Sequence, residues 1–93
     1  AHMPTLRAAI RARQKLDLTY RSLADATTTR TIRPLQMEYW GRVWTLTGWC
    51  ESERRFEVFR VDRIRTLDIT YDTFEEDPGK TLDDYFELAD DST

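Results

Sequence analysis

One stretch, from Arg42 to Ile64, constrains the fold of this chain more than any other. It holds two segments that are rich in aromatic and β-branched residues and are separated by a short polar break. The segments are residues 43–49 and 56–61, and the break is residues 51–53. Such segments on either side of a polar break are typical of a β-hairpin. The stretch therefore predicts two paired strands.

Alternation along these strands predicts which side chains face the core, because successive side chains in a strand point to opposite faces. Trp44 and Leu46 share one face and are expected in the core. Arg60 falls on the face opposite Phe59, so it is expected to leave the sheet on the other side. Residues 62–64 then predict a tight corner.

The rest of the chain predicts three further strands and a helix at each end. The expected elements are a helix over 5–14 capped by Thr5, strands over 16–21, 28–40 and about 67–71, and a second helix capped by Thr81. Pro34 restricts the long strand to an edge position or a bulge. Five short strands with helices only at the ends indicate a mainly β fold, as a strongly bent sheet or a partly open barrel.

Charge divides the chain into two parts. Up to Arg65 there are 13 basic against 7 acidic residues, whereas from Thr66 onward there is 1 basic residue against 10 acidic ones. This gradient suggests a basic binding face kept apart from an acidic tail, or a tail that folds back over that face. Of the 14 basic residues 12 are arginine, which suits bidentate phosphate recognition but fits codon bias equally well.

Composition excludes several classes of protein. A single cysteine, Cys50, rules out an internal disulfide and a Cys-based zinc cluster, and is expected to be a small buried residue in a reducing compartment. Apart from His2 the sequence has no histidine to activate a nucleophile, and it has no Gly-rich phosphate loop. No apolar run approaches the ~20 residues of a membrane span. A cytoplasmic protein without catalysis, metal or cofactor is expected.

Four short motifs, with a fifth segment after them, occur in order along the chain. They are Tyr20-Arg21-Ser22, residues 30–35 (Arg-Thr-Ile-Arg-Pro-Leu), Trp44-Thr45-Leu46 and residues 59–64 (Phe-Arg-Val-Asp-Arg-Ile), followed by Pro78 to Tyr85. Together they resemble the WYL domain of bacterial transcriptional regulators. The resemblance implies an Sm-like or SH3-like five-stranded β-barrel with an N-terminal helix and a short C-terminal helix.

The expected domain organisation has three parts. Residues 1–3 (Ala-His-Met) resemble a cloning scar, residues 4–74 form the barrel domain with its N-terminal helix, and residues 75–93 form an acidic segment with a short helix. The chain shows no helix-turn-helix pattern, which in this family usually precedes the WYL domain. The resemblance therefore implies the sensory half of a regulator whose DNA-binding domain is absent here.

In the family, matching basic positions are implicated in binding single-stranded nucleic acid or other negatively charged effectors. The resemblance transfers this role to a set of residues expected on one open face: Arg30, Arg60, Arg63, Arg33, Arg21 and Tyr20. Trp40 and Trp49 either stack on bases, at ~1–3 kcal/mol per base, or are structural. Arg63 has an alternative role in a salt bridge with Asp62 or as a cap on the corner.

The chain departs from the family pattern at four positions. Thr45 stands in place of the middle Tyr and Val61 in place of the usual Leu, whereas Glu53 and Glu57 stand where many members carry arginine. These glutamates, with the apolar face of the last helix, favour a second hypothesis. In that hypothesis the domain mediates dimerisation or domain docking and binds no small ligand.

Overall fold

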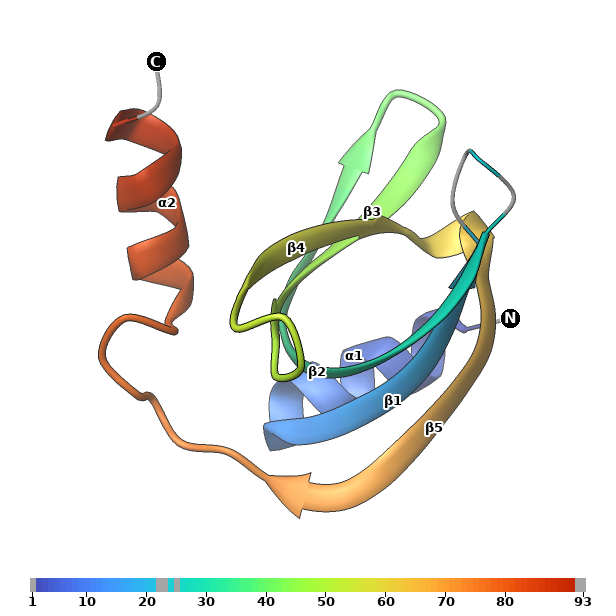
Figure 1. The fold of residues 1–93 in the computed structure, drawn as a ribbon, viewed down its shortest axis with the longest axis horizontal. Helices are drawn as coiled ribbons and strands as arrows, with labels where there is room; N and C mark the ends of the chain where they lie inside the picture. Colours follow the sequence, from blue (N-terminus) through green and yellow to red (C-terminus); the bar gives the residue numbers. More distant parts are fainter. Residues whose placement is uncertain (1, 22–23, 25, 92–93) are drawn as a thin grey trace.

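The computed structural model describes residues 2–21, 24 and 26–91. In this part of the chain five strands form one antiparallel sheet, in the order β4-β3-β2-β1-β5. The strands are β1 (Gln14–Arg21), β2 (Thr27–Trp40), β3 (Val43–Cys50), β4 (Arg55–Arg60) and β5 (Ile64–Thr73). The other elements are α1 (Met3–Ala12), the 3-10 helix η1 (Val61–Arg63) and α2 (Leu82–Asp91). Figure 1 shows a strongly curved sheet with α2 standing apart from α1.

The expected mainly β class is confirmed, but the five-stranded barrel is corrected to an open sheet. β4 and β5 are the two edges, and no strand pairing joins them in the described chain. Side chains bridge the open side instead, because the backbone N–H of Arg60 donates to the Tyr20 hydroxyl over 3.1 Å. The Tyr20 ring also meets the Phe59 ring edge-on, with centroids 5.0 Å apart. The corner at η1 turns β4 into β5 without pairing the two strands.

The core fills the space between the inner face of the sheet and α1. Its buried residues come from α1 and from every strand of the sheet: Leu6, Ala9, Leu16, Leu18, Ile32, Leu46, Cys50, Phe59, Val61 and Ile64. Leu46 and Cys50 are fully buried, as expected from alternation and from cysteine usage. Trp44, also expected in the core, is only partly buried at its margin.

The first helix begins earlier than the sequence predicts. α1 starts at Met3, and His2 holds the cap position without a side-chain hydrogen bond, so the expected cap by Thr5 is wrong. Pro4 lies in the first turn, where its missing N–H has no helical partner to lose. At the other end Arg13 takes a left-handed conformation, with φ of 53°, which ends the helix and starts β1 one residue later.

The long strand β2 carries the irregularity that Pro34 predicts. β2 lies in the middle of the sheet, and its pairing with β3 shifts register between Pro34 and Gln36, which is a bulge. Of the two positions that the sequence allowed for the proline, the bulge is confirmed. Pro34 pairs with Gly48, where the strands come so close that a Cβ on Gly48 would lie 2.8 Å from the carbonyl oxygen of Arg33.

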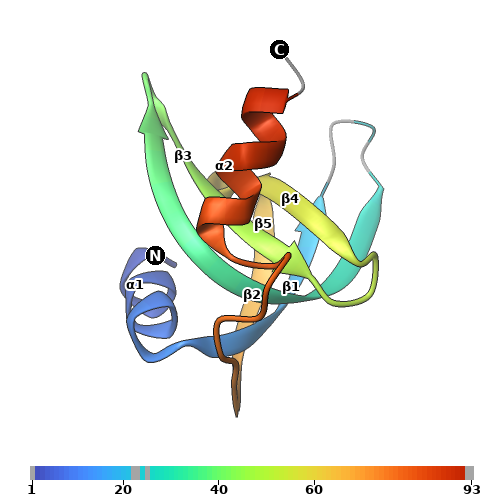
Figure 2. The ribbon, with the colours of Figure 1, turned by 90° about the vertical axis from the view of Figure 1, so that its left-hand side faces the viewer.

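The C-terminal segment leaves β5 and ends in α2, as Figure 2 shows. The expected cap is confirmed, because the backbone N–H of Asp84 donates to the Thr81 hydroxyl and the backbone N–H of Thr81 donates to the Asp84 carboxylate, each over 3.1 Å. Tyr85 packs on Phe56 of β4, with ring centroids 5.5 Å apart. Neither described helix is long and apolar enough to cross a membrane.

Candidate functional site

The arginines that the sequence nominates do not share one face of the sheet. Arg30 alternates with Thr31 on β2, so it lies on the same inner face as the buried Ile32. Arg33 lies on the opposite face of the same strand. Arg60 also lies on the outer face, since it follows the buried Phe59 on β4, as expected. The nominated cations therefore belong to separate environments.

Arg30 faces a carboxylate across the inner face of the sheet. Its Nε lies 3.4 Å from Oε1 of Glu57 on β4, and both side chains are about four-fifths buried, with exposed fractions of 21% and 18%. Both atoms are buried without a hydrogen bond to any described residue. Glu57 is one of the two glutamates that stand where the family resemblance leads us to expect arginine. Here it holds a negative charge beside the nominated cation.

Arg60 is paired with its near neighbour in sequence. Its Nε and Nη2 donate to the two carboxylate oxygens of Asp62 over 3.1 and 2.7 Å. This hydrogen-bonded pair lowers the pKa of Asp62 and raises the pKa of Arg60. A bidentate pair of this kind occupies the donors that a phosphate would use. Arg60 is thus compensated, although both side chains are about half exposed.

Arg33 is the most enclosed of the nominated arginines, with 9% of its surface exposed. Its Nη1 donates to Asp77 over 2.6 Å, its Nε lies 3.4 Å from Glu51, and its guanidinium lies 5.8 Å from the Phe74 ring centroid. The hydrogen bond from Arg33 lowers the pKa of Asp77. Burial by itself would raise the pKa of Glu51, but the hydrogen bond from Lys15 and the charge of Arg33 outweigh it and leave that pKa lowered. Arg33 therefore fastens the C-terminal segment to the sheet.

Three nominated residues do come together where β1 meets η1. Nη1 of Arg63 donates to the backbone carbonyl of Arg21 over 3.4 Å. Tyr20, the residue before Arg21, uses its hydroxyl on the backbone of β4. Asp62, the partner of Arg63 in the alternative role, is hydrogen-bonded to Arg60, which lowers its pKa, and the charge of Arg63 lowers that pKa further. This cluster holds the corner against β1.

The two stacking candidates have different surroundings. Trp49 is half-buried, with its ring edge-on to Phe56 at 5.0 Å and with Nζ of Lys80 5.6 Å from its ring centroid. Its faces are thus already in contact with the C-terminal segment and with β4. Trp40 lies next to the turn of the β2–β3 hairpin and is 62% exposed. Only Trp40 offers an open ring.

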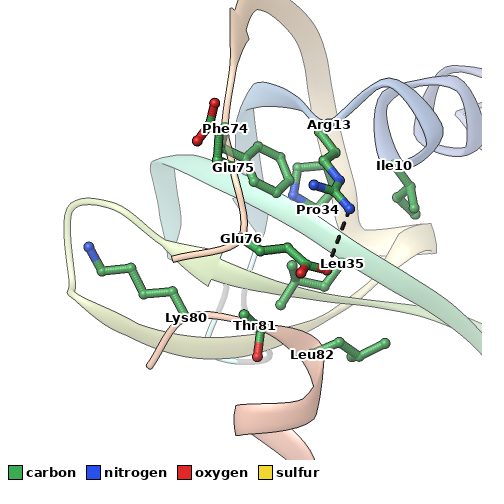
Figure 3. A pocket seen from close by; sticks show the side chains of 10 residues that line it. All are labelled: Ile10, Arg13, Pro34, Leu35, Phe74, Glu75, Glu76, Lys80, Thr81 and Leu82. Carbon is green, nitrogen blue, oxygen red and sulfur yellow. Dashed lines mark hydrogen bonds and ion pairs between the residues drawn. The ribbon is translucent and has the colours of Figure 1, made fainter. Parts of the chain in front are cut away.

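A cavity of about 260 Å³ separates the C-terminal segment from the sheet and α1 (Figure 3). It is lined by residues of both signs of charge together with apolar ones: Ile10, Arg13, Pro34, Leu35, Phe74, Glu75, Glu76, Lys80, Thr81 and Leu82. Arg13 reaches across it to Glu76 over 3.4 Å. Its charges are of both signs and are partly paired. We therefore interpret this cavity as a gap between two packed parts of the fold and not as an anion-binding site.

The sequence reasoning missed an aromatic and cationic surface at the hairpin tip. Tyr39 is 58% exposed and its ring lies 5.2 Å from that of Trp44, while the guanidinium of Arg7 lies 5.8 Å from the Trp44 ring centroid. The pairing of Tyr39 with Trp44 across the hairpin could be predicted from the position of the Gly41-Arg42 turn. The contact with α1 was not, because it depends on how the helix packs.

Metal chemistry has no obvious site in the described chain. No group of three or more His, Cys, Asp or Glu residues there is placed to hold a metal ion. The one cysteine, Cys50, is free and buried.

The curved sheet, its N-terminal helix and its arginine-rich corner define a known class of domain. A family model described as WYL domain matches residues 1–69, so the chain belongs to the WYL domain family. The resemblance drawn from the sequence motifs is confirmed by this match. Membership in this family supports a role as a regulatory domain of a transcriptional regulator.

Among solved structures the chain is similar to "Proteasome accessory factor B/C (PafBC) of Arthrobacter aurescens". The two share 28% sequence identity, with a TM-score of 0.74. The match covers 80% of this chain and 12% of that chain, so the present chain corresponds to a small part of the larger protein. No curated protein matches the sequence.

Proposed function

We propose that this chain is the non-enzymatic, effector-responsive domain of a cytoplasmic transcriptional regulator. Its effector is negatively charged, such as a single-stranded nucleic acid or a nucleotide, and its binding alters how a DNA-binding domain of the same regulator sits on its operator. Membership in the WYL domain family and the likeness to PafBC support the regulatory role. Arg30 supports the charge of the effector.

The observation that carries this proposal is the incomplete hydrogen bonding of the buried Arg30 side chain. Its Nε and Oε1 of Glu57 are buried, 3.4 Å apart, and neither atom forms a hydrogen bond with the described chain. Buried polar atoms are normally hydrogen-bonded, and leaving one unsatisfied costs about 1–3 kcal/mol. A phosphate offers oxygens that can satisfy a guanidinium with two bonds. An anionic effector would supply the hydrogen bonds that Arg30 lacks, while Glu57 keeps a second cation, Arg55, 3.7 Å away.

Fluorescence anisotropy with a labelled single-stranded oligonucleotide, across a salt series, tests this function. Glu57→Gln removes the competing charge and is expected to tighten binding about tenfold, whereas Arg30→Gln weakens it by a similar factor. Arg65→Gln, on an exposed residue of β5, is the matched control and leaves affinity nearly unchanged. Weak, salt-independent binding that is equal for wild type and Arg30→Gln would contradict the proposal.

A second function, as a docking module without a small ligand, is favoured by a different observation. Phe86 and Leu88 of α2 are 43% and 59% exposed, and Leu88 adjoins Phe56 and Tyr85 in a hollow beside the helix. Apolar side chains that form a contiguous exposed patch mark an interaction surface. Light scattering on chains with and without residues 79–93 tests this function, and a monomer in both cases would remove it.

A further inference from the structure

The exposed side of α2 combines an aromatic ring with negative charge. Asp83, Phe86 and Glu87 are exposed and are neighbours on the helix surface, at spacings of three and four residues. Tyr85 anchors α2 to Phe56 of β4, so this acidic face is left to solvent within one copy. We refer to Asp83, Phe86 and Glu87 as the acidic face.

A surface of opposite character lies at the hairpin tip, made by Arg7, Tyr39, Arg42 and Trp44; we refer to it as the tip surface. Tyr39 stacks at a tilt on Trp44, and Arg7 lies over the Trp44 ring. Arg7 and Arg42 are exposed, and neither forms an ion pair with any residue that the structure describes. They differ in this respect from Arg30, Arg33 and Arg60.

A hollow adjoins the tip surface. The cavity has a volume of about 370 Å³ and an apolar lining of Met3, Val43, Trp44, Val61 and Ile64. Its polar and charged lining residues are His2, Arg42 and Asp62, of which Asp62 is already paired with Arg60. A phenylalanine side chain fits such a volume. Aromatic side chains that fill a pocket near paired charges commonly supply most of the binding energy of an interface.

We propose that the tip surface is the docking site for the acidic face of a second copy of this chain. Phe86 of one copy enters the hollow beside Trp44 of the other, and Asp83 and Glu87 face Arg7 and Arg42. The tip surface supplies positive charge and a hollow, and the acidic face supplies negative charge and the ring of Phe86. The inference rests on the docking function proposed above and names its partner.

Reciprocal docking suits a two-fold dimer, because each copy carries both surfaces and the same contact forms twice. Within one copy the two surfaces are held apart, since Tyr85 fixes α2 against β4 while α1 packs on the other strands (Figure 1). Docking on its own copy would require the contact between Tyr85 and Phe56 to break. A second copy meets no such obstacle.

Charge reversal tests the proposal with two variants of the full chain. One carries Arg7→Glu and Arg42→Glu, and the other carries Asp83→Lys and Glu87→Lys, all at exposed positions. Each variant alone is expected to self-associate at least about tenfold more weakly than wild type, because like charges then meet at both contacts. An equimolar mixture is expected to form a heterodimer, since every contact again pairs opposite charges. Sedimentation velocity measures both, and circular dichroism checks that each variant is folded.

Four outcomes would overturn the inference. A wild-type chain that stays monomeric up to about millimolar concentration removes the self-docking function together with the inference. Dimers that persist in both variants leave the docking function standing but assign it to another surface. A mixture that remains monomeric shows that the two surfaces do not meet. A wild-type monomer whose tip surface binds a single-stranded oligonucleotide, with binding lost in Arg7→Glu/Arg42→Glu, assigns that surface to nucleic acid.

Discussion

The role of each nominated arginine in this domain depends mainly on the carboxylate that lies beside it. Arg30, Arg33 and Arg60 all meet carboxylates within 3.4 Å, although the family pattern presents them as candidate anion binders. Arg30 and Glu57 are mostly buried and each has a polar atom without a hydrogen bond in the described chain, whereas Arg33, whose Nε is also unbonded, keeps a 2.6 Å hydrogen bond to Asp77. A buried pair with one partner removed leaves an uncompensated charge. Glu57 is therefore the residue whose substitution distinguishes a latent anion site from a purely structural pair.

Gly48 is the one of the three glycines whose surroundings leave no room for a side chain. Gly48→Ala is expected to destabilise the domain by about 1–3 kcal/mol, because the added Cβ would lie 2.8 Å from a backbone oxygen that cannot rotate away. Urea denaturation followed by tryptophan fluorescence measures the change. Gly41→Asn is the control, since Gly41 has open space around it and a φ of 65° that asparagine tolerates. Equal stability of Gly48→Ala and wild type would refute the expectation.

Among the elements, α2 and the segment before it are attached to the sheet by few contacts. Arg33 binds Asp77, Lys80 lies over Trp49, and Tyr85 packs on Phe56. With the pair of Arg13 and Glu76 and the Arg33 guanidinium near the Phe74 ring, the segment has two ion pairs and three ring contacts. The pair with Arg33 makes this attachment sensitive to the charge state of Asp77.

Acid is expected to release this segment. The hydrogen bond from Arg33 lowers the pKa of Asp77 in the attached state, so the detached state binds the proton more readily. The contribution of this pair is complete above the ordinary aspartate pKa of about 3.9 and is lost as the pH falls through the lower pKa of the attached state. The indole N–H resonance of Trp49, followed by NMR from pH 7 down to about 2.5, reports the change.

A matched pair of variants controls for general acid unfolding. Asp77→Asn is expected to shift the Trp49 resonance toward its acid position already at pH 7, because the ion pair is absent. Asp72→Asn, at an exposed position on β5, is expected to leave the resonance unchanged. An unchanged spectrum in Asp77→Asn would show that the segment is held by its other contacts, the ring contacts and the pair of Arg13 with Glu76.

The whole molecule is a curved sheet with one open side that side chains close. Tyr20 bridges this opening, and α1 covers the inner face. The sheet therefore keeps two edges, of which β4 borders the open side and also carries the contact with α2. Any displacement of Glu57 or of α2 acts first on this edge strand.

Tyr20→Phe is expected to loosen the open side. The variant keeps the ring contact with Phe59 but removes the hydroxyl that accepts from Arg60, at a cost of about 0.5–1.5 kcal/mol. The amide of Arg60 should then exchange faster with deuterium, whereas amides of the central strand β2 change only by the global loss of stability. Uniform acceleration across the sheet would mean that the hydroxyl supports the whole fold and not this edge.

The sequence by itself determined the elements of this protein. Alternation of apolar residues predicted the strands and the core positions of Leu46 and Phe59, Pro34 predicted the bulge, and Thr81 predicted the second helix cap. These features depend on residues within a few positions of one another. The first helix was misplaced at both ends, since it spans Met3–Ala12 where 5–14 was expected, and β1 and β5 begin two or three residues earlier than expected. Trp44, expected in the core, lies at its margin.

Only the tertiary structure could show which charges meet and whether the sheet closes. Arg33 pairs with Asp77 and Arg30 with Glu57, residues that are distant in the chain and are brought together by strand order and by the path of the C-terminal segment. The interaction of two charges depends on their separation in space. Local patterns carry no record of that separation, so they predicted the arginines but not the carboxylates that face them.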